Sequence, residues 1–259
     1  MKQTRRNIVS SSPFSSNTLS FKSPWIVFWW SAAFPGFGHI LVNSYIWGFF
    51  LMVFEYTANT LSKINSAIYF TMTGQFETAK DIIEWRYFLV YSTVYVFAMW
   101  DSYRRCVDLN KVYQLAYRDS PAIKPFHFTS LELNFLEKKK PGLALIWSFL
   151  LPPLGYIYLQ RIPAALFSFI WWGTILHCSH VLEGVHYTAL GQFAQAKSIL
   201  DFQWLLYIPS IYGFSLYDSY TKTVENNLIF EIELSRFLKQ TYQQGSLDEL
   251  YGKENQCMS

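Results

Sequence analysis

The sequence predicts an all-α integral membrane protein built from two tandem repeats that share one orientation in the membrane. Three observations predict this class: apolar runs alternate with charged intervals, residues 24–110 recur 117 positions later, and Lys and Arg concentrate in alternate segments. The composition alone decides nothing, because 51% apolar residues is close to the share in ordinary globular proteins.

The apolar runs carry almost no charge. They span residues 24–42, 45–62, 87–100, 141–159, 162–182 and 202–217. A helix needs roughly 17 to 25 apolar residues to cross a bilayer core, and several runs approach that length. We therefore expect a multi-pass protein of the cell membrane, specifically the bacterial cytoplasmic membrane.

The N-terminal segment, residues 1–23, is basic and then Ser-rich. A secretory signal peptide would place an apolar core and a small-residue cleavage site there, so we do not expect this segment to be cleaved. Its polar composition predicts a disordered cytosolic tail.

The second half of the chain repeats the first. Residues 24–110 align with residues 141–227 without a gap, and 24 of the 87 aligned pairs are identical. Similarity over this length indicates that a whole structural unit is duplicated. The predicted organisation is membrane repeat 24–110, cytosolic linker 111–140 with a helix and a Pro-marked loop, membrane repeat 141–227, and a cytosolic amphipathic helix and tail at 228–259.

The distribution of positive charge orients the repeats. The two ends of the chain, the central linker and the junction at Arg161 hold 17 of the 21 Lys and Arg residues. The positive-inside rule therefore places both termini in the cytosol and the two segments that contain "GQF" outside. Each repeat then crosses the membrane an even number of times, which makes the repeats parallel rather than inverted.

The first apolar run of each repeat is interrupted, by Pro35 and Gly38 in one copy and by Pro152 and Gly155 in the other. Proline removes a backbone donor and glycine accepts positive φ, so the chain can reverse at membrane depth. We favour a re-entrant hairpin, shielded from lipid by neighbouring helices and followed by two transmembrane helices. A broken helix that spans the membrane is the alternative.

The stretches "FPGFGHILVNSYIWG" and "VFAMWDSY" resemble the two-pass membrane domain (TM-two domain) family. Units of that family carry a Pro/Gly-x-Gly-x-x-Tyr turn in the first hydrophobic stretch and end the last span near an Asp. His39 and Pro153 depart from this pattern, and each copy has a roughly 30-residue insertion around "GQF". The resemblance implies a membrane domain and no reaction, because the family is a scaffold found in proteins of varied role.

The inserted segments predict one helix in each repeat. Apolar residues recur at helical spacing from Phe76 and from Phe193, after breaks at Gly74 and Gly191. Each helix either docks a partner or lies at the membrane interface, or it packs its apolar stripe on the membrane bundle.

Two carboxylates recur in an Asp-Ser-Tyr triplet, Asp101 and Asp218, at the cytosolic end of the last span. A carboxylate at a helix C-terminus opposes the helix dipole, so it needs a partner. Arg104 and Arg105 are local partners in the first copy, and Thr221 and Lys222 are local partners in the second. The alternative is that both Asp residues accept amides freed at the Pro/Gly turns. On that reading they anchor the repeats together with those Pro and Gly residues, and replacing either Asp destabilises the protein equally.

Glu55 is the one Asp, Glu, Lys or Arg inside the run 45–62, and Trp172 stands at its position in the second copy. An ionisable group in hydrocarbon is costly and suggests a function or a buried partner. Glu55 either lines a polar cavity and binds a substrate cation, or it forms hydrogen bonds to a neighbouring Tyr or Ser.

His177, His180 and Glu183 follow one another at steps of three, so a continuous helix would bring them toward one metal ion. The first copy has Thr60, Lys63 and Ser66 there, so the cluster is not part of the repeated pattern. We predict no metal site and no cofactor, and we interpret these residues as hydrated histidines at the membrane interface.

The sequence places no nucleophile, base and orienting group together, and it contains no Gly-rich phosphate loop or zinc-type spacing. We therefore expect a non-enzymatic membrane scaffold or assembly subunit. Its expected partners are membrane lipid and other membrane proteins or a second copy, and no nucleic acid. The alternative is a small-solute transporter or channel with a site between the repeats near Glu55. The three Cys residues fit no pairing rule, and we expect no structural disulfide.

Overall fold

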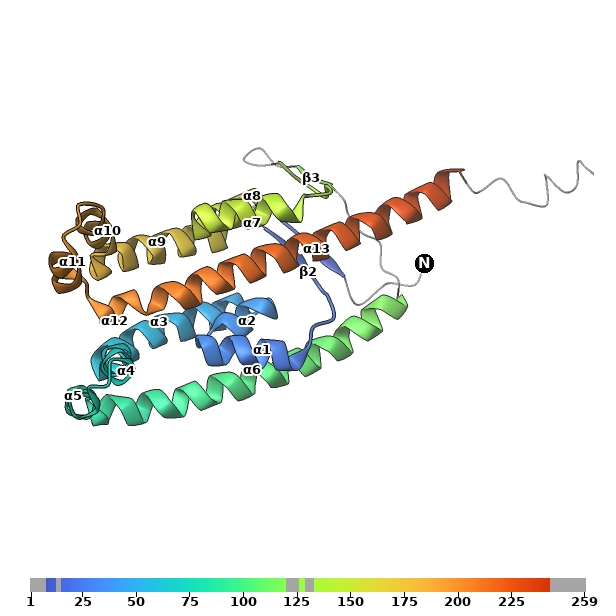
Figure 1. Ribbon diagram of the computed structural model, residues 1–259. Helices are drawn as coiled ribbons and strands as arrows, with labels where there is room; N and C mark the ends of the chain where they lie inside the picture. The colour runs from blue at the N-terminus through green and yellow to red at the C-terminus, as the bar shows by residue number, and fades with distance from the viewer. Residues whose placement is uncertain (1–7, 13–14, 120–125, 129–132, 243–259) are drawn as a thin grey trace, which may run out of the picture.

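The structure is a computed structural model that describes residues 8–12, 15–119, 126–128 and 133–242, and most of these residues are helical. Long helices run along one bundle (Figure 1). They are α3 (Tyr45–Ser62), α6 (Trp85–Asp119), α9 (Ile162–Ser179) and α13 (Tyr207–Tyr242). The predicted all-α class is confirmed. By length and composition, α9 is the one helix in the described residues that is long and apolar enough to cross a membrane.

Short helices complete the first unit, which we define as residues 24–110. Helices α1 (Pro24–Ala33) and α2 (Phe37–Leu41) precede α3. Helices α4 (Ile64–Met72) and α5 (Phe76–Ile82) follow it and lie across the end of the bundle that is remote from the N-terminus (Figure 1).

The second unit, residues 141–227, has the same order of elements. It contains α7 (Pro141–Leu150), α8 (Pro152–Tyr158), α9, α10 (Val181–Ala189), α11 (Phe193–Ile199), the short α12 (Phe202–Leu205) and the start of α13. The bounds of α9, α10 and α11 equal those of α3, α4 and α5 shifted by 117 residues. Positive φ angles at Asn43, Lys63 and Gly74 likewise recur at Gln160, His180 and Gly191.

Proline explains where the second unit departs from the first. Helix α6 runs unbroken from Trp85, whereas the corresponding helix breaks at Leu206 into α12 and α13. Pro209 has no backbone N–H, so it is tolerated in the first turn of α13 but would remove a hydrogen bond inside a longer helix. Pro35 and Pro152 occupy equivalent positions, but Gly36 has φ of 104° where the second unit has Pro153, so α2 begins at Phe37 whereas α8 already begins at Pro152.

The chain reverses between α1 and α2. Hydrogen bonds join residues along this segment to successive positions of α6: Lys22 to Asn110, Ala32 to Tyr95, His39 to Asp101, and Ser44 to Arg105. From Lys22 to Ala32 the partner on α6 shifts by 15 residues, about 22 Å, from Asn110 to Tyr95. After Ala32 the partners shift back along α6 toward Asn110. Helices α1 and α2 therefore form a hairpin whose tip lies beside the middle of α6.

Glycine allows the two arms of each hairpin to touch. A Cβ atom at Gly38 would lie 2.4 Å from the Val27 carbonyl oxygen and 2.2 Å from Ser31 Oγ. At Gly155 it would lie 1.8 Å from Ser148 Oγ. Any larger residue would push the arms apart, which explains why glycine occupies both positions.

The N-terminal segment contains a β-hairpin rather than a disordered tail. Strands β1 (Val9–Ser11) and β2 (Ser16–Thr18) pair antiparallel, and buried Ile8 packs against Ala116 and Ile229. The predicted disorder of residues 1–23 is therefore wrong for residues 8–12 and 15–23, while residues 1–7 and 13–14 lie outside the described residues. Polar composition misleads here because the order comes from contacts with distant helices.

The long helices α6 and α13 extend into the two other segments that the sequence predicts to be cytosolic, the central linker and the C-terminal segment. Helix α6 extends into the predicted linker as far as Asp119, and strands β3 (Phe126–Phe128) and β4 (Leu133–Phe135) pair beyond it. Residues 120–125, which include the predicted Pro-marked loop, lie outside the described residues. The predicted amphipathic helix from residue 228 is the last part of α13, and residues 243–259 also lie outside the described residues.

Candidate functional site

Asp101 is paired with three side chains. It accepts hydrogen bonds from Arg104 Nη2 at 2.7 Å and from Arg105 Nε at 2.5 Å, and His39 Nε2 lies 3.1 Å from its Oδ2. Burial raises the pKa of Asp101, but these hydrogen bonds outweigh burial and hold its pKa at about 2. The predicted local pairing with Arg104 and Arg105 is confirmed in this copy.

Asp218 pairs with an arginine that does not lie on its own helix, unlike Asp101. Arg161 Nη1 donates to Asp218 Oδ2 at 2.6 Å, and both side chains are almost fully buried. Arg161 belongs to the turn between α8 and α9, at the position that Ser44 occupies in the first unit. The local alternative is wrong for this copy, because Lys222 pairs with Asn43 and Glu225 instead.

Each carboxylate contacts the end of its own hairpin, but not through the amides that the anchor interpretation specifies. Asp101 contacts His39 in α2, and Asp218 contacts Arg161 directly after α8. The contacts that the structure shows are made by side chains and not by backbone amides next to Pro35 and Pro152. The carboxylates therefore act at the mouth of each hairpin rather than at its tip.

A buried charged cluster joins the two units at this end of the bundle. We call it the junction cluster, and it comprises Lys22, Asn43, Tyr45, Arg161, Asp218, Lys222 and Glu225. Arg161 Nη2 donates to Tyr45 Oη at 2.8 Å, and Lys222 Nζ donates to Asn43 Oδ1 at 3.0 Å. Each of these hydrogen bonds crosses from the second unit to the first.

Glu225 is the carboxylate that pairs with both lysines of the junction cluster. Lys222 Nζ lies 3.1 Å from Glu225 Oε2, and Lys22 Nζ pairs with Oε1. Burial raises the pKa of Glu225, but the two lysines outweigh burial and hold it at about 2. Thr18 of β2 also donates to Glu225, so the N-terminal β-hairpin is attached to the cluster.

Glu55 lies in a pocket near the opposite end of α3. Its side chain is 3% exposed. Oε1 accepts hydrogen bonds from Asn59 Nδ2 at 2.9 Å and from Tyr91 Oη at 3.2 Å, whereas Oε2 has no hydrogen-bond partner among the described residues. The adjoining pocket has a volume of about 230 Å³ and is lined by residues of both units.

Neutral amides connect the units beside this pocket. Gln203 of the second unit donates from Nε2 to Asn59 Oδ1 at 2.8 Å and accepts from the amide of Ser66 at 3.0 Å. Asn65 Nδ2 donates to the Gln203 carbonyl oxygen at 2.9 Å. No sequence pattern singles out Gln203, because its side chain is neutral and the equivalent residue of the first unit, Arg86, is of a different type.

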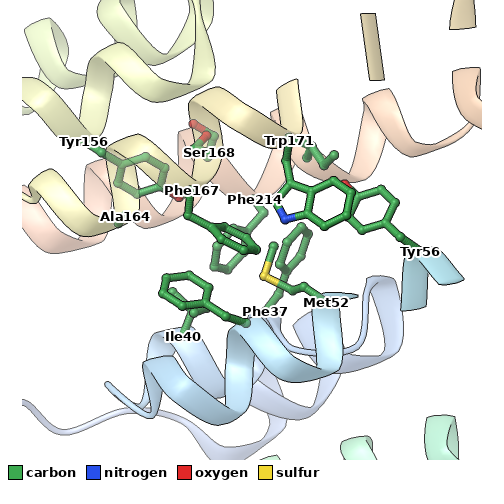
Figure 2. A pocket seen from close by; sticks show the side chains of 13 residues that line it. Phe37, Ile40, Met52, Tyr56, Tyr156, Ala164, Phe167, Ser168, Trp171 and Phe214 are labelled. Atoms are coloured by element: carbon green, nitrogen blue, oxygen red, sulfur yellow. The ribbon is translucent and has the colours of Figure 1, made fainter. Parts of the chain in front are cut away.

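Stacked aromatic rings fill the interface between the pocket and the junction cluster. Ring centroids lie 4.0 Å apart for Phe37 and Phe214, and 3.8 Å apart for Tyr56 and Trp171. These side chains face one another across the interface (Figure 2), and the space that they leave between them has a volume of about 40 Å³. Along α3, Tyr45 belongs to the junction cluster, the next two turns to this aromatic layer, and the following turn to the pocket.

The metal-ligand candidates His177, His180 and Glu183 do not form a ligand set. His180 has φ of 53° and separates α9 from α10, so His177 and Glu183 lie on different helices. His180 Nδ1 lies 3.6 Å from Glu183 Oε1. In the described part of the chain, no group of three His, Cys, Asp or Glu residues is arranged to hold a metal ion. The assumption of one continuous helix was wrong.

The segments that contain "GQF" form α5 and α11, as the periodicity predicts, and Gly74 and Gly191 precede them with φ of 80° and 74°. Helix α5 packs on α4 and α11 packs on α10. Phe76 and Phe193 stay 59% and 67% exposed. The apolar stripe is therefore only partly covered, since Ala79 and Ala196 are buried while the Phe at the start of each helix is exposed.

Comparisons of the chain with protein-family models, with curated proteins and with solved structures find no match. The function must therefore be argued from the geometry of these sites.

Proposed function

We propose that this chain is an integral membrane protein of two parallel repeats that acts as a non-enzymatic scaffold or assembly subunit. The observation that carries the proposal is an inverted distribution of polarity. Charged side chains such as Asp101, Asp218 and Arg161 are buried inside the bundle, while large apolar side chains cover its outside. The exposed apolar side chains include Trp29, Phe50, Leu89, Val96, Phe149, Leu166, Phe169 and Ile170. In water such a surface would aggregate, whereas in lipid it is the expected exterior.

The lengths of the uncharged segments support the same setting. Helices α3 and α9 each contain 18 residues, or about 27 Å, close to the thickness of a bilayer core. Residues 87–100 of α6 and residues 202–217 are uncharged. Each repeat then has two spanning helices, and α1–α2 and α7–α8 are re-entrant hairpins shielded by their neighbours.

The proposed orientation follows from charge. The junction cluster, with both chain termini, lies at the cytosolic side, and α4, α5, α10 and α11 lie at the outer surface of the bilayer. Exposed Phe76 and Phe193 suit insertion into the outer interface. A bacterial cytoplasmic membrane fits this arrangement, and so does the resemblance to two-pass membrane domains, since a Pro/Gly turn precedes two spans in each unit.

A scaffold is favoured over a conduit because aromatic rings occupy the interface between the units. A solute path from the Glu55 pocket to the cytosolic side would have to displace the stacked pairs Phe37–Phe214 and Tyr56–Trp171. The second candidate, a small-solute transporter, is favoured by the pocket itself, which places Glu55 between the units.

Affinity purification in mild detergent tests the proposal. A scaffold should co-purify with a membrane protein or a second copy in a fixed ratio, measured by light scattering and mass spectrometry. Chain that elutes as a monomer with only detergent and lipid, together with Glu55-dependent solute uptake into proteoliposomes, would contradict the scaffold and support the transporter.

A further inference from the structure

We propose that the Glu55 pocket is a binding site for the ammonium group of an organic cation. The proposal goes beyond a scaffold role and depends on the pocket alone. The lining includes Phe34, Glu55, Tyr91, Tyr95, Tyr207 and Ser210. At about 230 Å³, the pocket exceeds the roughly 150 Å³ of an engineered cavity that admits benzene.

The carboxylate supplies the charge. Glu55 Oε1 is held by Asn59 and Tyr91, which fixes the side chain, while Oε2 has no hydrogen-bond partner in the described part of the chain. Among the residues that line the pocket, none is Lys or Arg. A buried carboxylate without a cation is costly, so a bound ammonium group, even one without an N–H, would supply the missing counter-charge.

The aromatic rings supply the selectivity for an organic cation. Phe34, Tyr91, Tyr95 and Tyr207 all line the pocket, and the rings of Tyr91 and Tyr95 have centroids 5.5 Å apart. Tyr95 donates its hydroxyl to the Ala32 carbonyl oxygen at the tip of the hairpin, which holds its ring in place. Aromatic faces attract ammonium groups, and they do so more strongly when water is excluded.

A metal ion is a poorer occupant. Calcium takes six to eight oxygen ligands, whereas the lining contains a single carboxylate. Aromatic rings would contact much of such an ion without ligating it. Charge, lining and volume therefore agree on a small alkylammonium group.

The ammonium group can come from a free amine or from the headgroup of a lipid. Glu55 lies seven residues before the end of α3, about 10 Å along the helix from the proposed outer surface. That depth is within reach of either source, so the experiment must separate them.

The test uses the full chain in nanodiscs of phosphatidylglycerol, a lipid without an ammonium group, and measures binding by calorimetry. Choline is the probe, and 3,3-dimethylbutan-1-ol is its uncharged isostere. We expect choline to bind saturably and the isostere to bind at least tenfold more weakly. Equal binding of the two, or no saturable binding of choline, would overturn the proposal.

Substitutions at the pocket test whether choline binds beside Glu55. Glu55→Gln keeps an acceptor for Asn59 and Tyr91 but removes the charge, and it should weaken choline binding at least tenfold. Glu183→Gln, on exposed α10, is the matched control and should bind choline as the unmodified chain does. If Glu55→Gln fails to fold, Tyr95→Leu and Tyr95→Phe decide, since only loss of the ring should weaken binding. Unchanged binding in Glu55→Gln, or equal binding in the two Tyr95 variants, would overturn the proposal.

A second bilayer composition shows whether the ammonium group comes from a lipid headgroup or from a free amine. If a lipid headgroup occupies the pocket, nanodiscs of phosphatidylcholine should weaken the apparent binding of free choline by competition. If the ligand is a free amine, the two bilayers should give the same affinity.

Discussion

At the scale of the residue, the carboxylates Asp101 and Asp218 show how two copies of one motif acquire different partners. Asp101 takes Arg104 and Arg105 from its own helix, where the side chains are 52% and 30% exposed. Asp218 takes Arg161, whose side chain is 4% exposed. The cost of losing each carboxylate therefore depends on whether its arginine can return to water.

We predict that the two Asp→Asn substitutions lower the free energy of unfolding by unequal amounts. The sequence repeat alone suggests equal amounts. Asp218→Asn leaves a buried arginine unpaired and should cost about 3 to 5 kcal/mol. Asp101→Asn leaves arginines that can be solvated and should cost about 1 kcal/mol. Unfolding of the purified protein in detergent, followed by tryptophan fluorescence, measures both. Losses of equal size would contradict this account.

The lowered pKa of Glu225 predicts that the folded protein loses stability in acid. Its pKa falls from about 4.5 to about 2 on folding, so ionised Glu225 stabilises the folded state above pH 4.5. This contribution should be lost progressively as the pH falls from 4.5 to 2. The midpoint temperature of unfolding, measured across this range, should drop in the unmodified protein.

The variant Glu225→Gln should show a smaller acid loss, of which the share due to Asp101 remains because its pKa is also held at about 2. It should be less stable at neutral pH, because it leaves two buried lysines without a carboxylate. Glu231→Gln is the control, since its pair with Lys138 is exposed and should contribute less than about 1 kcal/mol. A Glu225→Gln variant that keeps the full acid loss would show that other groups cause it.

At the scale of the element, the hairpins α1–α2 and α7–α8 depend on glycine. We predict that Gly38→Ala destabilises the protein by about 1 to 3 kcal/mol, because the new Cβ meets a backbone oxygen that cannot move aside. Gly142→Ala is the matched control, since a Cβ there meets nothing within 4 Å. Chemical denaturation should show a loss for the first variant and none for the second. Equal stability of the two variants would contradict close packing of the hairpin arms.

Element prediction succeeds where the signal is local. Helical spacing and glycine breaks correctly predict α5 and α11, because both signals act within a few residues of the chain. The helix break at His180 was missed, since a left-handed residue is uncommon outside glycine and histidine signals it only weakly.

At the scale of the whole molecule, the membrane setting and the topology stay predictions that cysteine labelling can check. In a background without native Cys, Glu77→Cys and Gln195→Cys should react with an impermeant maleimide in intact cells, because α5 and α11 are exposed at the proposed outer end. Ser10→Cys should react only after the cells are opened. The reversed pattern would overturn the orientation, and reaction of all three would exclude the membrane arrangement.

The sequence by itself determined the helical class, the helix breaks at proline and glycine, and the residues that demand a partner. Periodicity, proline and glycine act over a few residues, so they can be read before the fold is known. The recurrence of helix bounds at an offset of 117 residues agrees with the recurrence of the sequence itself.

Only the tertiary structure decided the partners. The choice of Arg161 for Asp218, the position of Gln203 beside Asn59, and the docking of Ile8 on Ile229 join residues 57, 144 and 221 positions apart. No local pattern encodes such pairs, because each depends on how the two units pack against each other. For the same reason, Glu55 could be singled out from the sequence, whereas its free oxygen and its aromatic surroundings became visible only in the assembled bundle.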